Sequence, residues 1–208
     1  MDDTTQALAR FGLDEKAMSQ ALGTLLGHAI DDGDLYLEHI ESESIALEEG
    51  IVKKASRSVS QGAGVRAVTG ERTGYAHSDE FDGKELIEAA KTARAIAEGS
   101  GATTTVALKS DPRSPDLYRV SQNTLNEPLE KKLDLLNEID AIGREYDPRI
   151  KQVLANISSE IRHVVIVRAD GQVTIDKRPL ARLNVTCVAQ EGSNKQTGSA
   201  GGGGSYGG

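Results

Sequence analysis

Few residues of this chain have the types and spacing that catalysis or metal binding requires. The four histidines are His28, His39, His77 and His163. None of them belongs to an H-E-x-x-H pair of the kind that places two zinc ligands on one helix face. Asp79 and Glu80 follow one of these histidines closely, and the three side chains could bind a metal, but adjacent acidic residues are common in loops. We therefore favour structural roles for all four histidines.

The remaining candidates for chemistry are equally weak. Cys187 is the single cysteine, which excludes an intramolecular disulfide and fits a reducing compartment. It alternates with Leu183 and Val185 and lacks a thiol-activating motif, so we expect a small core residue. The glycines of Gly62-Ala63-Gly64 lack the third glycine of a dinucleotide fingerprint. No pair of carboxylates stands out as a general acid and base.

Charge and hydropathy narrow the class of protein. The formal net charge is -8 over 208 residues, which disfavours nucleic acid as a partner. No apolar run is long enough to cross a bilayer, so no membrane partner is expected. The stretch Met1-Asp2-Asp3-Thr4 is acidic and does not resemble a signal peptide, so we expect a cytoplasmic protein.

Helical periodicity predicts three helices. The first runs from Asp14, its predicted N-cap, to about residue 31, with Gly33 as its stop signal. The second begins at Asp82 and ends at Gly99. The third covers residues 127–146, with leucines and an isoleucine recurring on one face.

Strand patterns fill much of the rest. Residues 31–50 hold eight acidic groups and no Lys or Arg, and Lys53, Lys54 and Arg57 follow shortly after Gly50. This pattern predicts a hairpin with acidic and basic strands. In the next strand, Gly62 and Gly64 suggest a bulge or the close approach of another backbone. Turns are expected at Gly70 and Gly74.

The sequence pattern of the carboxy-terminal third predicts strands joined by tight turns. Alternation begins near Ile150, Asp170-Gly171 predicts a hairpin, and residues 191–194 predict another turn. A further short strand is expected at residues 106–108. Consecutive strands with tight turns imply antiparallel pairing, so the fold class is α+β, with a mostly antiparallel sheet and about three helices packed on it.

An ordered set of short motifs resembles the amino-terminal region of the TldD branch of the TldD/PmbA metalloprotease family. The motifs are Gly33-Asp34-Leu35-Tyr36, Gln61-Gly62-Ala63-Gly64-Val65-Arg66-Ala67, Gly70-Glu71-Arg72-Thr73-Gly74-Tyr75-Ala76, Arg178-Pro179-Leu180-Ala181-Arg182 after Asp170-Gly171, and Gly198-Ser199-Ala200-Gly201-Gly202-Gly203-Gly204. Each motif is weak by itself, whereas their order and rough spacing across residues 13–208 are specific.

The resemblance implies a zinc-dependent peptidase that acts on unfolded or extended peptides, usually paired with a PmbA-like subunit. In that family an H-E-x-x-x-H helix and a further ligand hold the metal, downstream of the glycine-rich segment. No position of this chain matches them, so no catalytic or metal-binding residue is carried over, and zinc is expected only in the parent enzyme. Without metal ligands, the chain alone is expected to be inactive.

The expected division is an amino-terminal α+β domain over residues 1–197 and a glycine-rich segment over residues 198–208 that leads to a catalytic domain. Gly201, Gly202, Gly203 and Gly204 are the candidate edge against which a peptide substrate lies, because missing side chains let another backbone come close. Two alternatives stay open. The chain can be a stand-alone interaction module that pairs with a PmbA-like or full-length partner, or with itself, and residues Gly201–Ser205 can be a flexible synthetic linker.

Overall fold

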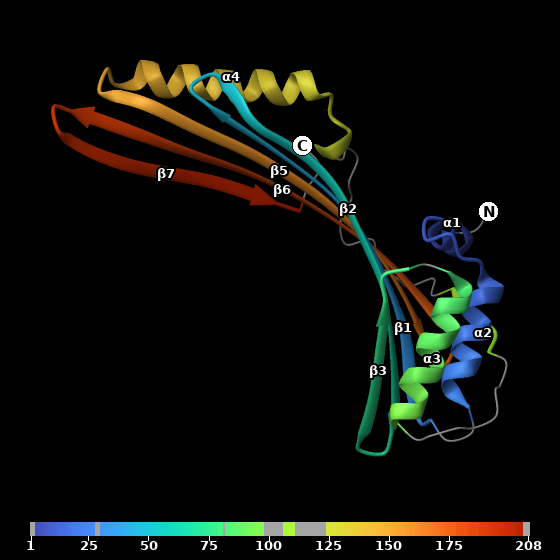
Figure 1. The fold of residues 1–208 in the computed structure, drawn as a ribbon. Coiled ribbons are helices and arrows are strands. Elements are labelled where there is room, and N and C mark those ends of the chain that lie inside the picture. The colour runs from blue at the N-terminus through green and yellow to red at the C-terminus, as the bar shows by residue number, and fades with distance from the viewer. Residues whose placement is uncertain (1–2, 28–29, 81, 98–105, 111–123, 206–208) are drawn as a thin grey trace. The chain divides into compact units, whose positions relative to one another are not determined.

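The computed structural model describes residues 3–27, 30–80, 82–97, 106–110 and 124–205 (Figure 1). His28 and Gly99 lie outside the described residues. The elements are α1 (Asp3–Ala9), α2 (Glu15–Leu26), β1 (Asp32–Glu48), β2 (Ile51–Thr69), β3 (Arg72–Ser78), α3 (Gly83–Ala97), β4 (Lys109–Ser110), a 3₁₀ turn (Thr124–Asn126), α4 (Leu129–Tyr146), β5 (Ile150–Arg168), β6 (Gln172–Glu191) and β7 (Asn194–Gly204).

The strands form one mostly antiparallel sheet in the order β3-β2-β1-β5-β6-β4, with β7 also paired to β6. The two-residue strand β4 is parallel to β6. This confirms the α+β class. The three predicted helices are present as α2, α3 and α4, and α1 is a fourth that the sequence patterns did not reveal. No described helix is long and apolar enough to cross a membrane.

Helix boundaries follow the predicted signals at their starts better than at their ends. The Asp14 carboxylate accepts a hydrogen bond from the Ala17 N–H at 2.7 Å, and Asp82 accepts one from the Lys84 N–H at 2.9 Å. The prediction that Gly33 ends α2 is wrong. The helix ends at Leu26 with Gly27 as its C-cap at φ 36°, and Gly33 lies inside β1.

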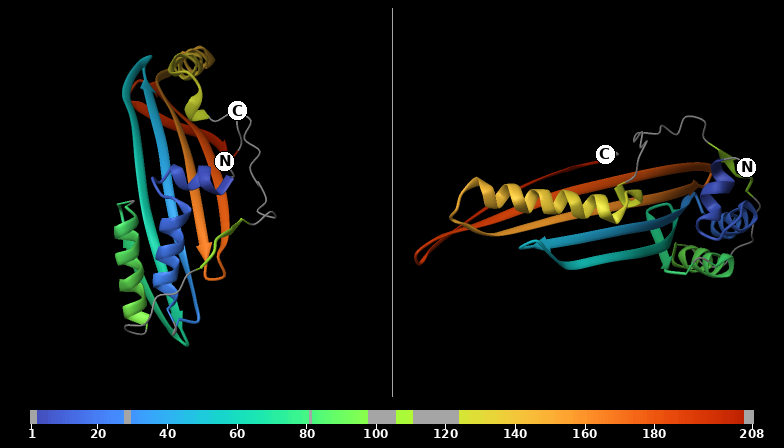
Figure 2. Two further views of the ribbon diagram at one scale, coloured as in Figure 1. Left: turned by 90° about the vertical axis from the view of Figure 1, so that its right-hand side faces the viewer. Right: turned by 90° about the horizontal axis from the view of Figure 1, so that it is seen from above.

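The chain divides into two compact units. The first comprises Met1–His39, Ser60–Asp116 and His163–Lys177, and the second comprises Ile40–Val59, Leu117–Arg162 and Arg178–Gly208. Strands β1, β2, β5 and β6 contribute residues to both. Figure 2 shows the ribbon from two further sides.

The first unit has a core between its part of the sheet and helices α2 and α3. The apolar face of α2 supplies Met18, Leu22 and Leu25, all fully buried, while α3 supplies mainly alanines. Small side chains on α3 allow a close approach to β3. That contact corrects another prediction: Gly74 is not in a turn but in β3, where an added Cβ would lie 1.8 Å from the Ala93 carbonyl oxygen of α3.

Two motifs that carry the family resemblance meet in this unit. The Arg66 guanidinium on β2 donates from Nε to the Asp34 carboxylate on β1 at 2.7 Å, and Asp32 lies 3.6 Å away. The hydrogen bond with Asp34 raises the pKa of Arg66. At Gly64 the close neighbour is a side chain and not the predicted backbone, because the Tyr75 hydroxyl lies 2.6 Å from where a Cβ would stand.

The second unit packs one helix, α4, on one face of its strands. Its core consists of Ile45, Leu47, Leu136, Ala155 and Ile157. Cys187 is half-buried and free, and its sulfur lies 3.6 Å from the position of an added Cβ at Gly143 of α4, which fits the expected packing role.

The predicted hairpins are present. Glu49 and Gly50, at φ 54° and 70°, form the two-residue turn between β1 and β2, and Arg57 pairs with Glu41 across these strands at 3.2 Å. Gly171 at φ 81° stands in the β5–β6 turn, and Gly192 at φ 59° stands in the β6–β7 turn. The short strand expected at residues 106–108 lies instead at Lys109–Ser110.

Candidate functional site

The glycine-rich segment forms the carboxy-terminal end of the regular strand β7. Strand β7 pairs with β6 from Asn194 opposite Glu191 to Gly204 opposite Ala181. It lies at the outside of the sheet in Figure 1, and its residues are exposed except the half-buried Gly204. In the described part of the chain, β6 is the one strand paired with it. One edge of β7 therefore presents backbone groups without a neighbouring strand.

The ladder indicates which backbone groups of β7 point outward. Antiparallel strands alternate between residues that exchange hydrogen bonds and residues that turn their N–H and C=O away. The Gln190 N–H bonds to the Arg149 carbonyl at 2.8 Å, away from β7. Alternation then assigns the same direction to Arg182 and Asn184. Their partners Gly203 and Gly201 consequently turn N–H and C=O towards the free edge.

The four candidate glycines differ in what surrounds them. A Cβ at Gly201 would lie 2.5 Å from Oδ1 of Asn184, and one at Gly203 would lie 2.5 Å from the Ala181 carbonyl oxygen. A Cβ at Gly202 would meet nothing within 4 Å. Gly204 is half-buried opposite Ala181. Gly201 and Gly203 thus combine an outward-turned backbone with a side-chain position that neighbouring atoms of β6 crowd.

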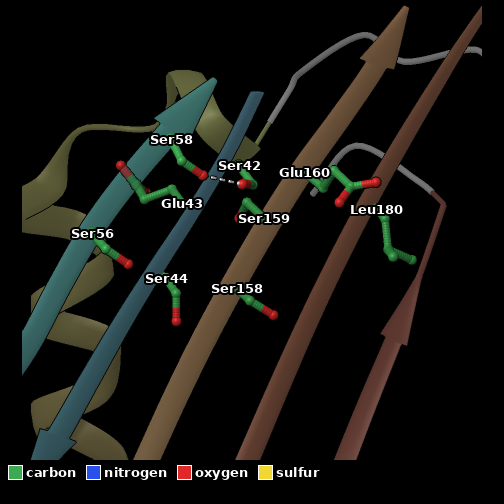
Figure 3. Close-up of a pocket in the computed structure, with 9 residues that line it drawn as sticks. All are labelled: Ser42, Glu43, Ser44, Ser56, Ser58, Ser158, Ser159, Glu160 and Leu180. Carbon is green, nitrogen blue, oxygen red and sulfur yellow. Dashed lines mark hydrogen bonds between the residues drawn. The ribbon is translucent and has the colours of Figure 1, made fainter. Parts of the chain in front are cut away.

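A hollow of about 200 Å³ lies in the same unit. It is lined by Ser42, Glu43, Ser44, Ser56, Ser58, Ser158, Ser159, Glu160 and Leu180. Figure 3 shows serines from β2, β1 and β5 side by side along this hollow, with Ser42 and Ser58 joined through their hydroxyl groups at 2.9 Å.

Strand alternation places most of these serines on the face opposite α4. Ile45 and Leu47 pack against α4, so the even-numbered Ser42 and Ser44 of β1 point the other way. The Asn156 amide donates to the Ser44 hydroxyl at 3.1 Å. On the neighbouring strands, Thr186 and Ser199 share a hydroxyl contact at 2.9 Å. The helix-free face of the second unit is therefore rich in groups that both donate and accept hydrogen bonds.

The sequence patterns missed this polar face. The signal was present in the spacing of two serines on each side of the predicted β1–β2 turn, at Ser42, Ser44, Ser56 and Ser58. Serines two apart share a strand face, and a hairpin brings the two pairs together.

The three described histidines, His39, His77 and His163, lie in strands. His77 lies in β3 with its ring stacked on Tyr75 at 6.5 Å between centroids, and His39 lies 6.5 Å from His163. Within the described residues, no group of three or more His, Cys, Asp or Glu side chains could hold a metal ion. The groups that these described residues expose are strand backbone and hydroxyl groups, which can donate and accept hydrogen bonds.

The fold and this edge define an α+β protein with a polar sheet face and an accessible strand edge. Two family models match the chain: PmbA/TldA metallopeptidase domain 1 over residues 33–97 and the PmbA/TldA metallopeptidase central domain over residues 123–208. Together they span most of its length. The chain belongs to the TldD/PmbA metallopeptidase family.

Curated relatives agree. The chain is 35% identical to a Metalloprotease TldD homolog of Haemophilus influenzae over 86% of its own length, and 30% identical to one of Buchnera aphidicola subsp. Schizaphis graminum over 96%. It spans only 37% and 41% of the lengths of these relatives.

Solved structures share the fold. A crystal structure from Bacteroides thetaiotaomicron matches 99% of this chain and 46% of its own with a TM-score of 0.70 at 16% identity. TldE from Thermococcus kodakarensis matches 90% of this chain and 42% of its own with a TM-score of 0.62 at 19% identity.

Proposed function

We propose that this chain is the amino-terminal, non-catalytic part of a cytoplasmic zinc-dependent metallopeptidase that degrades or processes unfolded peptides. Its role is to form scaffold and substrate channel and to dock a partner subunit. The observation that carries the peptide role is the free edge of β7, where Gly201 and Gly203 turn backbone groups outward. An extended peptide that adds a strand there gains main-chain hydrogen bonds regardless of its sequence, as an enzyme for unfolded peptides requires.

The zinc implied by the family has no ligand set among the described residues. No step of hydrolysis is therefore derived for them. Under this proposal, the glycine-rich strand is the junction between residues 1–197 and the catalytic part of the enzyme, and it presents the peptide to that part.

Peptide addition at the β7 edge is tested by N-methylation of the peptide. We expect a ten-residue polar peptide to bind the 208-residue chain, measured by fluorescence anisotropy. In a docked strand only every second residue forms main-chain hydrogen bonds with β7. N-methylation of the residues that form these bonds should weaken binding at least about tenfold, whereas N-methylation of the residues between them should leave the affinity nearly unchanged. Equal effects of both sets would contradict edge addition, and the absence of any binding at high concentration would contradict the peptide role.

Partner docking is supported by the outer surface of α4. Leu135, Ile142 and Tyr146 recur seven and four residues apart and are 41%, 59% and 86% exposed. Apolar residues at this spacing share one helix face, and an exposed apolar stripe is typical of an interface. TldE is among the relatives with this fold, and we propose a PmbA-like subunit as the partner rather than a second copy.

Charged residues in this stripe should abolish the pairing. We expect Leu135→Glu/Ile142→Glu to lower the fraction of chain that elutes with a PmbA-like subunit in size-exclusion chromatography with light scattering. Asp134→Asn, at an exposed polar position of the same helix outside this stripe, is the matched control and should leave the complex intact. A complex that survives the double substitution would place the interface elsewhere, and self-association in the absence of the subunit would favour a homodimer.

A further inference from the structure

Among the residues that the structure describes, Arg182 is a cation without an anionic partner, and it lies on the strand next to the proposed peptide edge. It lies exposed on β6, and in the described part of the chain its guanidinium makes one side-chain hydrogen bond, from Nε to Oδ1 of Asn184 at 3.1 Å, and no ion pair. Glu160, an acidic residue that lines the hollow, pairs with Arg162 at 3.3 Å. The two terminal nitrogens of Arg182 remain available to a ligand.

Asn184 holds this arginine over the glycine strand. Its Oδ1 occupies space that a side chain at Gly201 would need, since an added Cβ there would lie 2.5 Å away. At Gly203 an added Cβ would lie 3.1 Å from Cα and 3.2 Å from Cβ of Arg182. The missing side chains of β7 therefore let both polar groups of β6 lie towards the edge where Gly201 and Gly203 expose their backbone.

A strand docked on β7 would bring its own side chains within reach of Arg182. Successive strands lie about 4.8 Å apart, so a docked peptide would run roughly 9.6 Å from β6. Side chains opposite Gly201 and Gly203 would project from the same face as Arg182 and Asn184, with no β7 side chain between. The planar guanidinium matches a carboxylate, which accepts two parallel hydrogen bonds from it.

We infer that Arg182, oriented by Asn184, is a specificity-determining residue that selects extended peptides carrying a carboxylate opposite Gly201 or Gly203. This inference rests on the proposed peptide role of the β7 edge. The carboxylate can belong to an Asp or Glu side chain or to the end of the peptide, since both offer the same pair of oxygens. An acidic preference is independent of the main-chain bonds, which any sequence can make.

The test compares matched fluorescent peptides on the intact 208-residue chain. One probe is a ten-residue Thr/Ser/Gln peptide with an amidated end, a second replaces one central Gln with Glu, and a third is the first with a free carboxyl end. In low salt the wild-type chain should bind the second or third probe about three- to fivefold more tightly than the first, as expected for an exposed ion pair. The gain should disappear at 1 M salt, where the Debye length is about 3 Å.

Arg182→Gln should remove the preference for a carboxylate and leave the affinity for the first probe unchanged. Arg182→Lys, which keeps the positive charge, should keep part of this preference. Lys195→Gln, a charge removal further along β7, is the control and should keep the preference. A gain with the second probe assigns a side-chain carboxylate and a gain with the third assigns the chain end. Equal binding of all three probes, or a preference that persists in Arg182→Gln, would overturn the inference while the peptide role stands. Failure of the first probe to bind would overturn the peptide role itself.

Discussion

Gly74→Ala is expected to lower the free energy of unfolding of the first unit by about 3 kcal/mol or more, because no space exists for one methyl group. The added Cβ would lie 1.8 Å from the Ala93 carbonyl oxygen and 2.9 Å from the Ala97 nitrogen. Both are backbone atoms of α3, so no side chain can rotate away to relieve the overlap. The helix must move from β3, and the buried alanines of its inner face lose contact.

Urea denaturation followed by circular dichroism measures this effect, with Gly62→Ala as the control. Gly62 lies in the adjacent strand β2, has no positive φ, and its added Cβ would stand 3.7 Å from the Ser78 carbonyl oxygen, an ordinary contact. We expect the control to change the unfolding midpoint little or to raise it slightly, since alanine restricts the unfolded chain more than glycine does. A similar loss in both variants would mean that the strands tolerate no substitution and that the α3 contact is not the cause.

Gly74 also shows what sequence patterns can and cannot predict here. Apolar periodicity identified α2, α3 and α4, and alternation identified the buried face of β5, because these signals are local to one element. A glycine in a turn and a glycine under a helix look the same in the sequence. The difference depends on where α3 crosses β3, and that is a tertiary contact between elements separated in the chain.

The glycine strand is a second example. Gly201 to Gly204 have low intrinsic strand propensity, and their composition is also typical of a flexible linker. Pairing with β6 supplies the order that propensity does not, and the strand begins at Asn194, before the glycine run starts. The candidate edge is a prediction from the missing side chains of the glycine run. The polar residues beside it could not be predicted in this way, because the position of Asn184 and Arg182 depends on the register between β6 and β7.

Lys132→Met is expected to destabilise the second unit by about 3 kcal/mol. The Lys132 side chain on α4 is 4% exposed and donates to the Glu43 carboxylate on β1, whose side chain is 18% exposed. Methionine fills a similar volume, so little packing is lost. The effect comes from Glu43, which would remain largely removed from water beside the apolar core of α4 without its cation.

Three further variants separate charge from packing in the same urea measurement. Lys131→Met removes the neighbouring lysine, which pairs with Glu127 at 3.2 Å and is 72% exposed, and should cost less than about 0.5 kcal/mol. Glu43→Gln removes the carboxylate alone, and Lys132→Met/Glu43→Met removes both charges. The double variant should be more stable than Lys132→Met, because replacing both members of a buried pair by apolar groups is often neutral. If the double variant is instead the least stable, packing and not charge explains the loss.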